Sequence, residues 1–327
     1  MRAAVITEPG GPGVFRVQEV DDPKAGPEDV LVDVKASALN RADLLQREGK
    51  YPAPPGVQTE IPGLEFSGVV IEAGERVLGV AKGDKVFGLL PGGGYASRVV
   101  THHRMVMPMP ANMDFVQAAA IPEVFFTAYD ALFNHCELIM GESVLIHAIG
   151  SGVGTAALQL AHHAGAYVYG TAGSADKLAK AAELGLDVGI NYKDQDFAEI
   201  IREKTNRTGV NVVLDMIGEH YWERNLASMS LKGRLVLVGL MGGDKVQTSL
   251  GALMPKRLRI HGTTLRARPL EEKIAITQQI TKNVLPMIAD GRIVPVVDRD
   301  FPLEKVTQAH EYMESNANFG KIILSID

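Results

Sequence analysis

The sequence predicts an α/β protein in which a doubly wound parallel sheet is inserted into a β-rich module. Three observations support this prediction. An apolar run at 143–146 leads through a glycine-rich loop into a helical pattern. Short apolar runs then alternate with amphipathic segments up to residue 265. The chain before about residue 124 instead carries short strands between clusters of glycine and proline, which is typical of a β-rich module.

The first 123 residues are predicted to form an all-β module with irregular connections. Turn clusters at 9–13 and 91–94 separate its short apolar runs. The predicted strands are 3–7, 15–20, 30–38, 65–73, 84–89 and 95–101. A helical pattern begins near residue 114 and covers 114–120 and 125–133.

The glycine-rich loop carries the most specific local pattern in the chain. Gly152, Val153 and Gly154 open a G-x-G-x-x-A sequence, and a helix is expected over 155–165. A dinucleotide pyrophosphate must approach backbone N–H groups at a helix N-terminus, and a Cβ there would hold it away. Glycines of an ordinary turn are the alternative, but the flanking strand and helix favour the dinucleotide-binding unit of a Rossmann fold.

The segments that follow support a parallel sheet covered by helices on both faces. Predicted strands are 167–171, 188–191, 210–215 and 234–239, and predicted helices are 175–184, 197–204 and 221–229. A sixth run at 258–265 is expected to close the sheet at an edge, where a free strand favours dimer contact.

Beyond this sheet, the chain is predicted to return to the N-terminal module, with a ligand cleft between the two parts. The predicted elements are a helix at 270–288, a strand at 294–297, a helix at 303–314 and a strand at 321–326.

Bulk properties exclude several classes of protein. The 327 residues exceed one ordinary core, and 46% hydrophobic and 22% charged residues suit a globular protein. A net charge of −6 argues against nucleic acid or an anionic membrane as the main partner. No apolar run of membrane-spanning length occurs, and the N-terminus has a strand pattern. Cys136 is the single cysteine, so we expect a protein of the reducing cytoplasm.

Several sequence blocks together resemble one known family. The blocks are 38–43, 62–65, 90–96, 118–123, 145–148, 151–154, 191–193, 240–243 and 318–321. As a set they resemble the zinc-free quinone oxidoreductases of the medium-chain dehydrogenase/reductase superfamily, most of all the branch that a tumour suppressor induces in mammals. The resemblance implies a GroES-like β-rich catalytic domain at 1–124 and 268–327, with a Rossmann NADPH-binding domain at 125–267.

The metal ligands of zinc-dependent relatives are missing at the matching positions. The resemblance places Asn40 and Leu64 where those relatives carry zinc ligands. One cysteine cannot form a four-cysteine site, and the adjacent histidine pairs at 102–103 and 162–163 have no third ligand nearby. We therefore expect no metal, and a reaction that reduces an already electrophilic acceptor. His147 is expected to be a buried, hydrogen-bonded core residue.

The end of the second Rossmann strand favours NADPH. NAD-specific sites place a carboxylate there, whereas this chain has Gly173 and Ser174, followed by Lys177 in the first helical turn. Lys177 and Ser174 would bind the 2′-phosphate, and the resemblance adds Tyr192. A solvated surface lysine is the alternative, and Asp176 is a possible competing ribose ligand.

The remaining cofactor candidates come from the resemblance and from the ends of strands. The resemblance places five residues near the cofactor: Asn40, Thr127, Met241, Leu265 and Asn318. Ligands bind at the carboxyl ends of strands in open α/β sheets, which independently favours 215–218, including Gly218, and 239–243. Asp215 could equally only cap the following helix.

The predicted activity is NADPH-dependent reduction of a quinone by hydride transfer. Tyr51 precedes a proline-rich stretch, and the resemblance places its loop opposite the nicotinamide, where its ring would flank a planar acceptor. Ser151 would border the same pocket, so Tyr51, Asn40 and Ser151 are the catalytic candidates. The alternatives are an alkenal or enone double-bond reductase and a non-catalytic NADPH-binding protein. We expect a conjugated carbonyl substrate and a homodimer or tetramer, with no nucleic acid or membrane partner.

Overall fold

The computed structural model describes residues 1–327 and contains two compact units. Unit 1 comprises Met1–Phe126 and Leu265–Asp327, and unit 2 comprises Thr127–Thr264. The observed divisions therefore fall after residues 126 and 264, against 124 and 267 in the sequence prediction.

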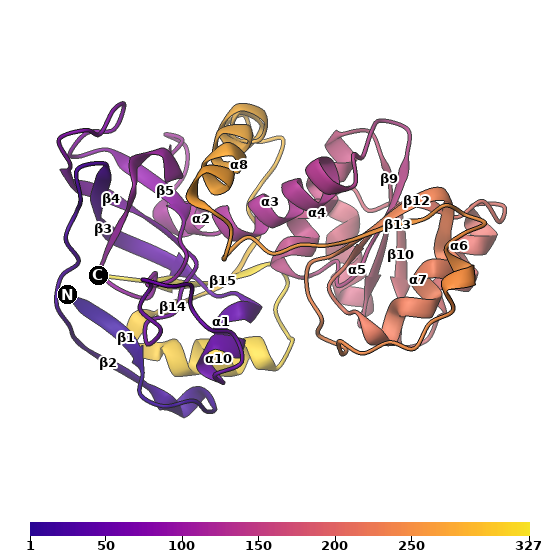
Figure 1. Cartoon of the computed structure of the whole chain (residues 1–327), viewed down its shortest axis with the longest axis horizontal. Helices are drawn as coiled ribbons and strands as arrows, with labels where there is room; N and C mark the ends of the chain where they lie inside the picture. The colour runs from indigo at the N-terminus through magenta and orange to yellow at the C-terminus, as the bar shows by residue number, and fades with distance from the viewer. The chain divides into compact units, whose positions relative to one another are not determined.

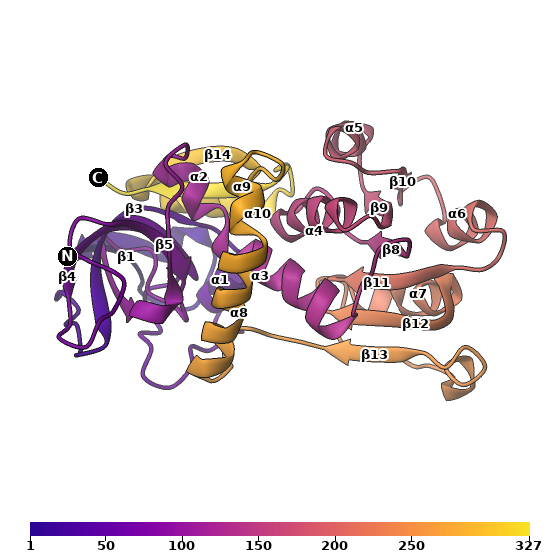
Figure 2. The same cartoon turned by 90° about the horizontal axis from the view of Figure 1, so that it is seen from above.

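Unit 2 is built on a fully parallel six-stranded sheet, as predicted. The strand order is β10-β9-β8-β11-β12-β13, which Figure 2 shows almost edge-on. The strands are β8 Ser143–Ile146, β9 Tyr167–Ala172, β10 Val188–Asn191, β11 Val210–Asp215, β12 Met229–Leu237 and β13 Arg259–Gly262. The edge position predicted for the sixth strand is confirmed, whereas dimer contact through it stays a prediction. β12 begins at Met229, well before the predicted start at residue 234, with a left-handed residue, Lys232, inside it.

Helices cover both faces of this sheet, with α4 and α5 on one side and α6 and α7 on the other (Figure 1). Their bounds are α4 Gly152–His163, α5 Ala175–Glu183, α6 Phe197–Lys204 and α7 Trp222–Ser228. α4 begins three residues before its predicted start, because Ser151 caps it directly after the loop. The core between the sheet and helices includes Leu145, Phe197, Ile201 and Leu235. This arrangement is the predicted Rossmann fold.

Unit 1 contains a curved, mostly antiparallel sheet and a small two-stranded ribbon. Its main sheet has the order β14-β15-β3-β4-β5-β7, with β6 paired to the other side of β3, and the ribbon is β1-β2. The first strands are β1 Arg2–Ile6, β2 Phe15–Glu19, β3 Asp29–Ala38, β4 Glu65–Ala73, β5 Lys85–Leu89, β6 Arg98–His102 and β7 Val106–Pro108. The core includes Val32, Phe66, Tyr95 and Leu324. The seven-residue helix α1 (Arg41–Arg47) shows that the all-β prediction for this region was wrong.

The helices that follow residue 114 and residue 269 also differ in detail from the prediction. α2 spans Phe115–Ala119, and α3 spans Pro122–Tyr129 and continues as a π-helical turn over Asp130–His135. The long helix predicted for 270–288 is divided into α8 (Leu270–Asn283) and α9 (Leu285–Ala289), because Pro286 cannot donate a backbone hydrogen bond inside a helix.

The C-terminal return to the N-terminal module is confirmed, since β15 (Lys321–Ser325) pairs antiparallel with β3. It is preceded by α10 (Val306–Glu314). The strand predicted at 294–297 was misplaced: β14 spans Val297–Pro302 and pairs parallel with β15. None of the helices combines the length and apolar character needed to span a membrane.

Candidate functional site

The loop between β8 and α4 brings backbone close to the start of a helix. Ser151 Oγ accepts a hydrogen bond of 3.0 Å from the N–H of Gly154, and thereby caps α4. A Cβ on Gly154 would lie 2.4 Å from the carbonyl oxygen of Ala148, so only glycine fits. Ala148 itself has a left-handed φ of 47°. The tight turn exposes helix N-terminal N–H groups in the manner that suits a pyrophosphate.

Turns after β11 and β12 lie against this loop at the carboxyl edge of the sheet. The Ser151 hydroxyl is 3.5 Å from Met216 Sδ, and the N–H of Met241 donates to the carbonyl of Met216 at 3.1 Å. Gly218 has a φ of 81°, and its Cβ would be 2.6 Å from the carbonyl oxygen of Gly243. The structure therefore brings Ser151, Gly218 and Met241 together where the strand order reverses between β8 and β11.

A buried polar chain fixes the turn after β11. Asp215 accepts hydrogen bonds from the backbone N–H groups of Ile217 (2.7 Å) and Gly218 (3.2 Å) and from Asn225 Nδ2 (2.9 Å). Asn225 Oδ1 is 2.7 Å from His147 Nε2, and Thr171 Oγ1 is 3.0 Å from His147 Nδ1. Because the Asn225 amide nitrogen already donates to Asp215, His147 Nε2 is the donor.

Both titratable members of this chain are strongly affected by burial. Burial raises the pKa of Asp215 to about 6, against the effect of its hydrogen bonds, and lowers the pKa of His147 to about 4. The prediction of His147 as a buried, hydrogen-bonded residue is confirmed. Asp215 holds the turn at Ile217 and Gly218 directly instead of only capping a helix.

The predicted 2′-phosphate residues cluster after β9 and β10. A Cβ on Gly173 would lie 2.7 Å from the Tyr192 hydroxyl and 3.2 Å from Lys193 Cε, so both side chains lie across this glycine. Ser174 Oγ accepts a 3.4 Å hydrogen bond from the N–H of Lys177 and caps α5. Asp176 forms an ion pair with Lys180 at 2.9 Å. Lys193 was not predicted, although its place directly after Tyr192 at a strand end was a usable signal.

In unit 1, Asn40 belongs to a buried charged cluster. Lys321 Nζ donates to Asn40 Oδ1 (2.6 Å), to Glu65 Oε1 (2.7 Å) and to the carbonyl of Leu39 (2.7 Å). Asn40 Nδ2 donates to the same Glu65 oxygen at 2.8 Å, and the N–H of Glu123 donates to Glu65 Oε2 at 2.8 Å. The Lys321 and Glu65 side chains are only 3% and 0% exposed. The ammonium group thus fixes which way the Asn40 amide faces.

These residues do not suit zinc. Of the two positions that match zinc ligands, Leu64 has no donor atom, and the Asn40 oxygen already accepts from the Lys321 ammonium. Glu65, the neighbouring carboxylate, is paired with the same ammonium. No group of three histidine, cysteine, aspartate or glutamate side chains in the chain is arranged to hold a metal ion. A divalent cation here would have to displace a buried lysine charge.

A second buried network anchors the start of α1. Asp43 accepts from the N–H of Asn40 (2.8 Å), the N–H of Gly63 (3.2 Å) and the Tyr95 hydroxyl (3.0 Å). His310 Nε2 is 3.4 Å from the Tyr95 hydroxyl, and Arg47 Nη1 is 3.2 Å from His310 Nδ1. Arginine only donates, so His310 Nδ1 accepts and its Nε2–H points to Tyr95. Burial raises the pKa of Asp43 to about 6 and lowers the pKa of His310 to about 3.

Tyr51, the predicted acceptor residue, lies in the loop after α1 and is partly buried. The guanidinium of Arg266 lies 5.0 Å from the centre of the Tyr51 ring, and Arg266 Nη1 donates to the Tyr51 carbonyl at 3.4 Å. Burial raises the pKa of the Tyr51 phenol, while the charge of Arg266 acts in the opposite direction. Sequence reasoning missed Arg266, which is more than 200 positions away along the chain.

The other candidates occupy separate places. Thr127 lies in α3 in unit 2, whereas Leu265 and Asn318 belong to unit 1. Asn318 Nδ2 donates to the carbonyl of Gly320 at 2.8 Å, which holds the turn before β15. Val153 lies in the first turn of α4 with Gly152. The roles of these residues in cofactor binding stay predictions.

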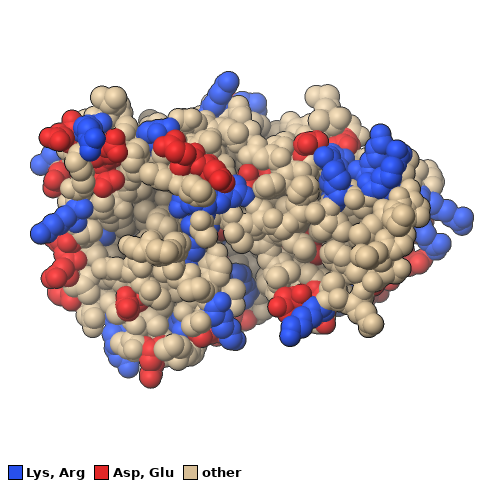
Figure 3. Space-filling model, in the orientation of Figure 1, with Lys and Arg blue, Asp and Glu red and all other residues tan.

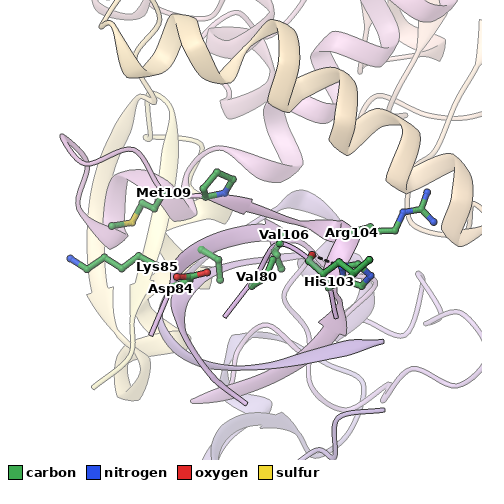
Figure 4. A pocket seen from close by; sticks show the side chains of 11 residues that line it. Val80, Asp84, Lys85, His103, Arg104, Val106 and Met109 are labelled. Atoms are coloured by element: carbon green, nitrogen blue, oxygen red, sulfur yellow. Dashed lines mark hydrogen bonds between the residues drawn. The ribbon is translucent and has the colours of Figure 1, made fainter. Parts of the chain in front are cut away.

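The surface of unit 1 has an open hollow of about 490 Å³ that contains none of these candidates. Figure 4 shows Asp84 and Lys85 at one end and His103 and Arg104 at the other, with Val80 and Val106 between them. On the face seen in Figure 3, acidic and basic side chains are interspersed over unit 1. Nothing in the geometry of this hollow connects it with the candidate site.

Comparisons with known proteins agree with this geometry. Residues 26–111 match the family described as alcohol dehydrogenase GroES-like domain, and residues 152–282 match the family described as zinc-binding dehydrogenase. The chain belongs to the medium-chain dehydrogenase/reductase superfamily, and it is a nicotinamide-dependent oxidoreductase.

Among its relatives, the quinone oxidoreductase of Rattus norvegicus is 33% identical over 99% of this chain and 97% of the rat protein. Three solved structures are similar over 99–100% of both chains. They are an NAD-dependent alcohol dehydrogenase (TM-score 0.89, 32% identity, 100% of both chains), the CurK enoyl reductase (0.89, 29%, 100% and 99%) and the Escherichia coli quinone oxidoreductase complexed with NADPH (0.88, 30%, 99% and 100%).

Proposed function

We propose that this protein reduces quinones with NADPH, by hydride transfer and without a metal. The observation that carries the proposal is the Lys321 ammonium bound to Asn40 and Glu65. The resemblance matches Asn40 to a zinc ligand of zinc-dependent relatives. A built-in lysine cannot ionise an alcohol as a metal does, so an acceptor that is already electrophilic suits the site better. The rat and Escherichia coli quinone oxidoreductases support this choice of acceptor.

The preference for NADPH over NADH is supported by the surroundings of Gly173. The end of β9 offers no carboxylate for ribose hydroxyls, and Asp176 is paired with Lys180. Tyr192 and Lys193 lie across Gly173, next to the start of α5 where Ser174 and Lys177 are found. Lys177 in the first turn of α5 opposes the helix dipole, Lys193 adds a positive charge beside Gly173, and a bound phosphate would relieve this conflict.

Each unit has its own part in the proposed reaction. When bound, NADPH supplies a hydride, which carries two electrons to the quinone and leaves NADP⁺. The Ser151–Gly154 loop holds the pyrophosphate through backbone N–H groups. The Tyr51 hydroxyl donates a hydrogen bond to the quinone oxygen that gains negative charge. That oxygen then takes a proton from water, and transfer of the ring C–H proton to the second oxygen through water completes the hydroquinone.

A double-bond reductase is the second candidate, because the CurK enoyl reductase shares 29% identity and the whole fold. An enone also accepts hydride at carbon and develops charge on its carbonyl oxygen, so the same residues would serve both reactions. The two candidates differ in which acceptor has the higher kcat/KM.

The test is steady-state oxidation of NADPH with a panel of quinones and enones. We expect quinones to have the higher kcat/KM, and Tyr51→Ala to lower that value by roughly one to two decades while NADPH binding, measured by fluorescence, stays nearly constant. Ser151→Val adds bulk to the glycine loop and should lower both kcat/KM for quinone and the affinity for NADPH. Unchanged quinone kinetics in Tyr51→Ala would place the acceptor elsewhere, and turnover confined to enones would favour the second candidate.

A further inference from the structure

Arg266 is a buried arginine whose hydrogen-bond partners are all neutral. Its residue is 6% exposed. Nε donates to the carbonyl of Pro91 at 2.7 Å, Nη2 donates to Gln46 Oε1 at 2.6 Å, and Nη1 donates to the carbonyl of Tyr51 at 3.4 Å. The guanidinium thereby ties together three segments of unit 1, namely α1, the Tyr51 loop and the turn at Pro91.

The other buried cations of the protein have acidic partners. Lys321 pairs with Glu65 at 2.7 Å, Arg234 pairs with Glu142 at 2.6 Å, and Arg47 pairs with Glu314. Arg266 forms no such ion pair. A buried charge without a directly bonded acid is costly to folding, and arginine stays protonated even when burial lowers its pKa, as it does here against the opposing charge of Asp43. The retained charge therefore acts on its surroundings, which include the Tyr51 ring at 5.0 Å.

We propose that Arg266 is a positioning residue for the acceptor: it holds the Tyr51 ring against its guanidinium and strengthens the Tyr51 hydroxyl as a hydrogen-bond donor. A cation over an aromatic face attracts the ring and fixes its orientation. A positive charge near a phenol also favours the state in which the phenol oxygen is more negative, so its proton is given more fully to an acceptor. This inference rests on the proposed role of Tyr51.

The arrangement favours one class of acceptor. Substrates whose oxygen becomes a full anion on hydride arrival, such as quinones, gain most from a donor that is backed by a positive charge. An acceptor whose oxygen gains less negative charge would be stabilised correspondingly less by this donor. Arg266 would therefore contribute to the choice of substrate as well as to the rate.

The experiment compares four variants of the full-length protein in the quinone assay: Arg266→Gln, Arg266→Lys, Tyr51→Phe and the double variant of Arg266→Gln with Tyr51→Phe. Arg266→Gln should lower kcat for quinone about 10- to 100-fold, with the KM for NADPH changed less than about twofold. Arg266→Lys keeps the charge and should recover part of the rate. In the Tyr51→Phe background, Arg266→Gln should lower kcat for quinone less than about threefold, because the two residues act as a unit.

A matched control and a direct titration complete the test. Arg104 pairs with Glu271 on the surface of the same unit at 3.0 Å, so Arg104→Gln should leave quinone kinetics unchanged. Ultraviolet difference titration, with Tyr51→Phe as the reference, should show a higher pKa for the Tyr51 phenol in Arg266→Gln. A purely structural arginine would not change the phenol in this way.

Two results would overturn the inference. One is that Arg266→Gln lowers kcat for quinone by the same factor whether residue 51 is tyrosine or phenylalanine. The other is a lower melting temperature with unchanged kcat per folded molecule and an unchanged phenol pKa. If Arg266→Gln proves too unstable to assay, Arg266→Lys takes its place. The change in kcat that it causes is then compared in the unaltered protein and in the Tyr51→Phe variant. Failure of the proposed function itself looks different, because Tyr51→Phe and Tyr51→Ala would then both leave quinone turnover intact.

Discussion

The two units contain buried polar chains of similar design but different surroundings. In unit 2, Asp215 is connected to His147 through the amide of Asn225, and the chain ends on the Thr171 hydroxyl. In unit 1, Asp43 is connected to His310 through the Tyr95 hydroxyl. The unit 1 chain then continues to Arg47, whose charge pairs with the partly exposed Glu314.

This difference indicates how each unit positions its candidate functional residues. Unit 2 positions a turn, and the ligand contacts proposed for it are backbone N–H groups and two lysines. Unit 1 positions side chains, and it does so with three buried cations, Arg47, Arg266 and Lys321. Backbone contacts tolerate substitution of neighbours, whereas a buried charge depends on every partner. Substitutions in unit 1 should therefore have the larger effects.

The strongest test of this contrast compares the buried ion pairs. Lys321→Met leaves Glu65 buried without its cation and should lower the free energy of unfolding by about 3–5 kcal/mol. Arg234→Met in unit 2 should cost less, about 1–3 kcal/mol, because water can reach the partly exposed Glu142. Denaturant unfolding measures both values. Adding Glu65→Gln to Lys321→Met should recover part of the loss, and equal costs in the two units would contradict the contrast.

The pH dependence of stability should reveal the buried acids and histidines. The folded-state pKa of Asp43 is raised from 3.8 to about 6, so its contribution to stability is present below pH 4 and is lost as the pH rises towards 6. His147 and His310, lowered to about 4 and about 3, contribute stability above pH 6.5 that is lost as the pH falls. The two kinds of group oppose each other between pH 4 and 6.

Asp43→Asn removes one of the two buried carboxyls whose pKa is raised, and Asp215 remains as the other. The stability of this variant should increase more steeply with pH between 4 and 6 than that of the unaltered protein, by a total of about 2 kcal/mol over this window. Thermal unfolding measured across this range gives the two slopes. Parallel slopes would show that Asp43 titrates near its ordinary pKa.

The smallest predicted effect concerns two lysines of unit 2, the half-buried Lys177 and the exposed Lys193. Lys177→Ala should weaken NADPH binding by roughly 1.5–3 kcal/mol and leave NADH nearly unchanged, because only NADPH carries the 2′-phosphate. Lys193→Ala should act in the same direction with a smaller size, since its ammonium is on a flexible chain. Fluorescence titration with both cofactors measures this. Lys204→Ala, at the exposed end of α6, is the control, and equal losses for NADPH and NADH would contradict a phosphate-binding role.

Local sequence signals were sufficient for most of unit 2. The bounds predicted for β10, α6 and β11 agree with the structure, since apolar periodicity and turn residues define such elements locally. Errors occurred where a local signal was overlooked: Asn40 and Asp43 form a capping box that begins α1, and Pro286 divides the predicted long helix.

By itself, the sequence determined the fold class, the glycine loop at 151–154 and the absence of cysteine and histidine ligands at the zinc positions. Each of these depends on residue type and short spacing, which a single chain displays directly. Only the tertiary structure decided that Lys321 binds Asn40 and Glu65, that His310 meets Tyr95, and that Arg266 lies against Tyr51. These partners are separated by more than 200 positions, and only burial in a common core brings their charges close enough to interact.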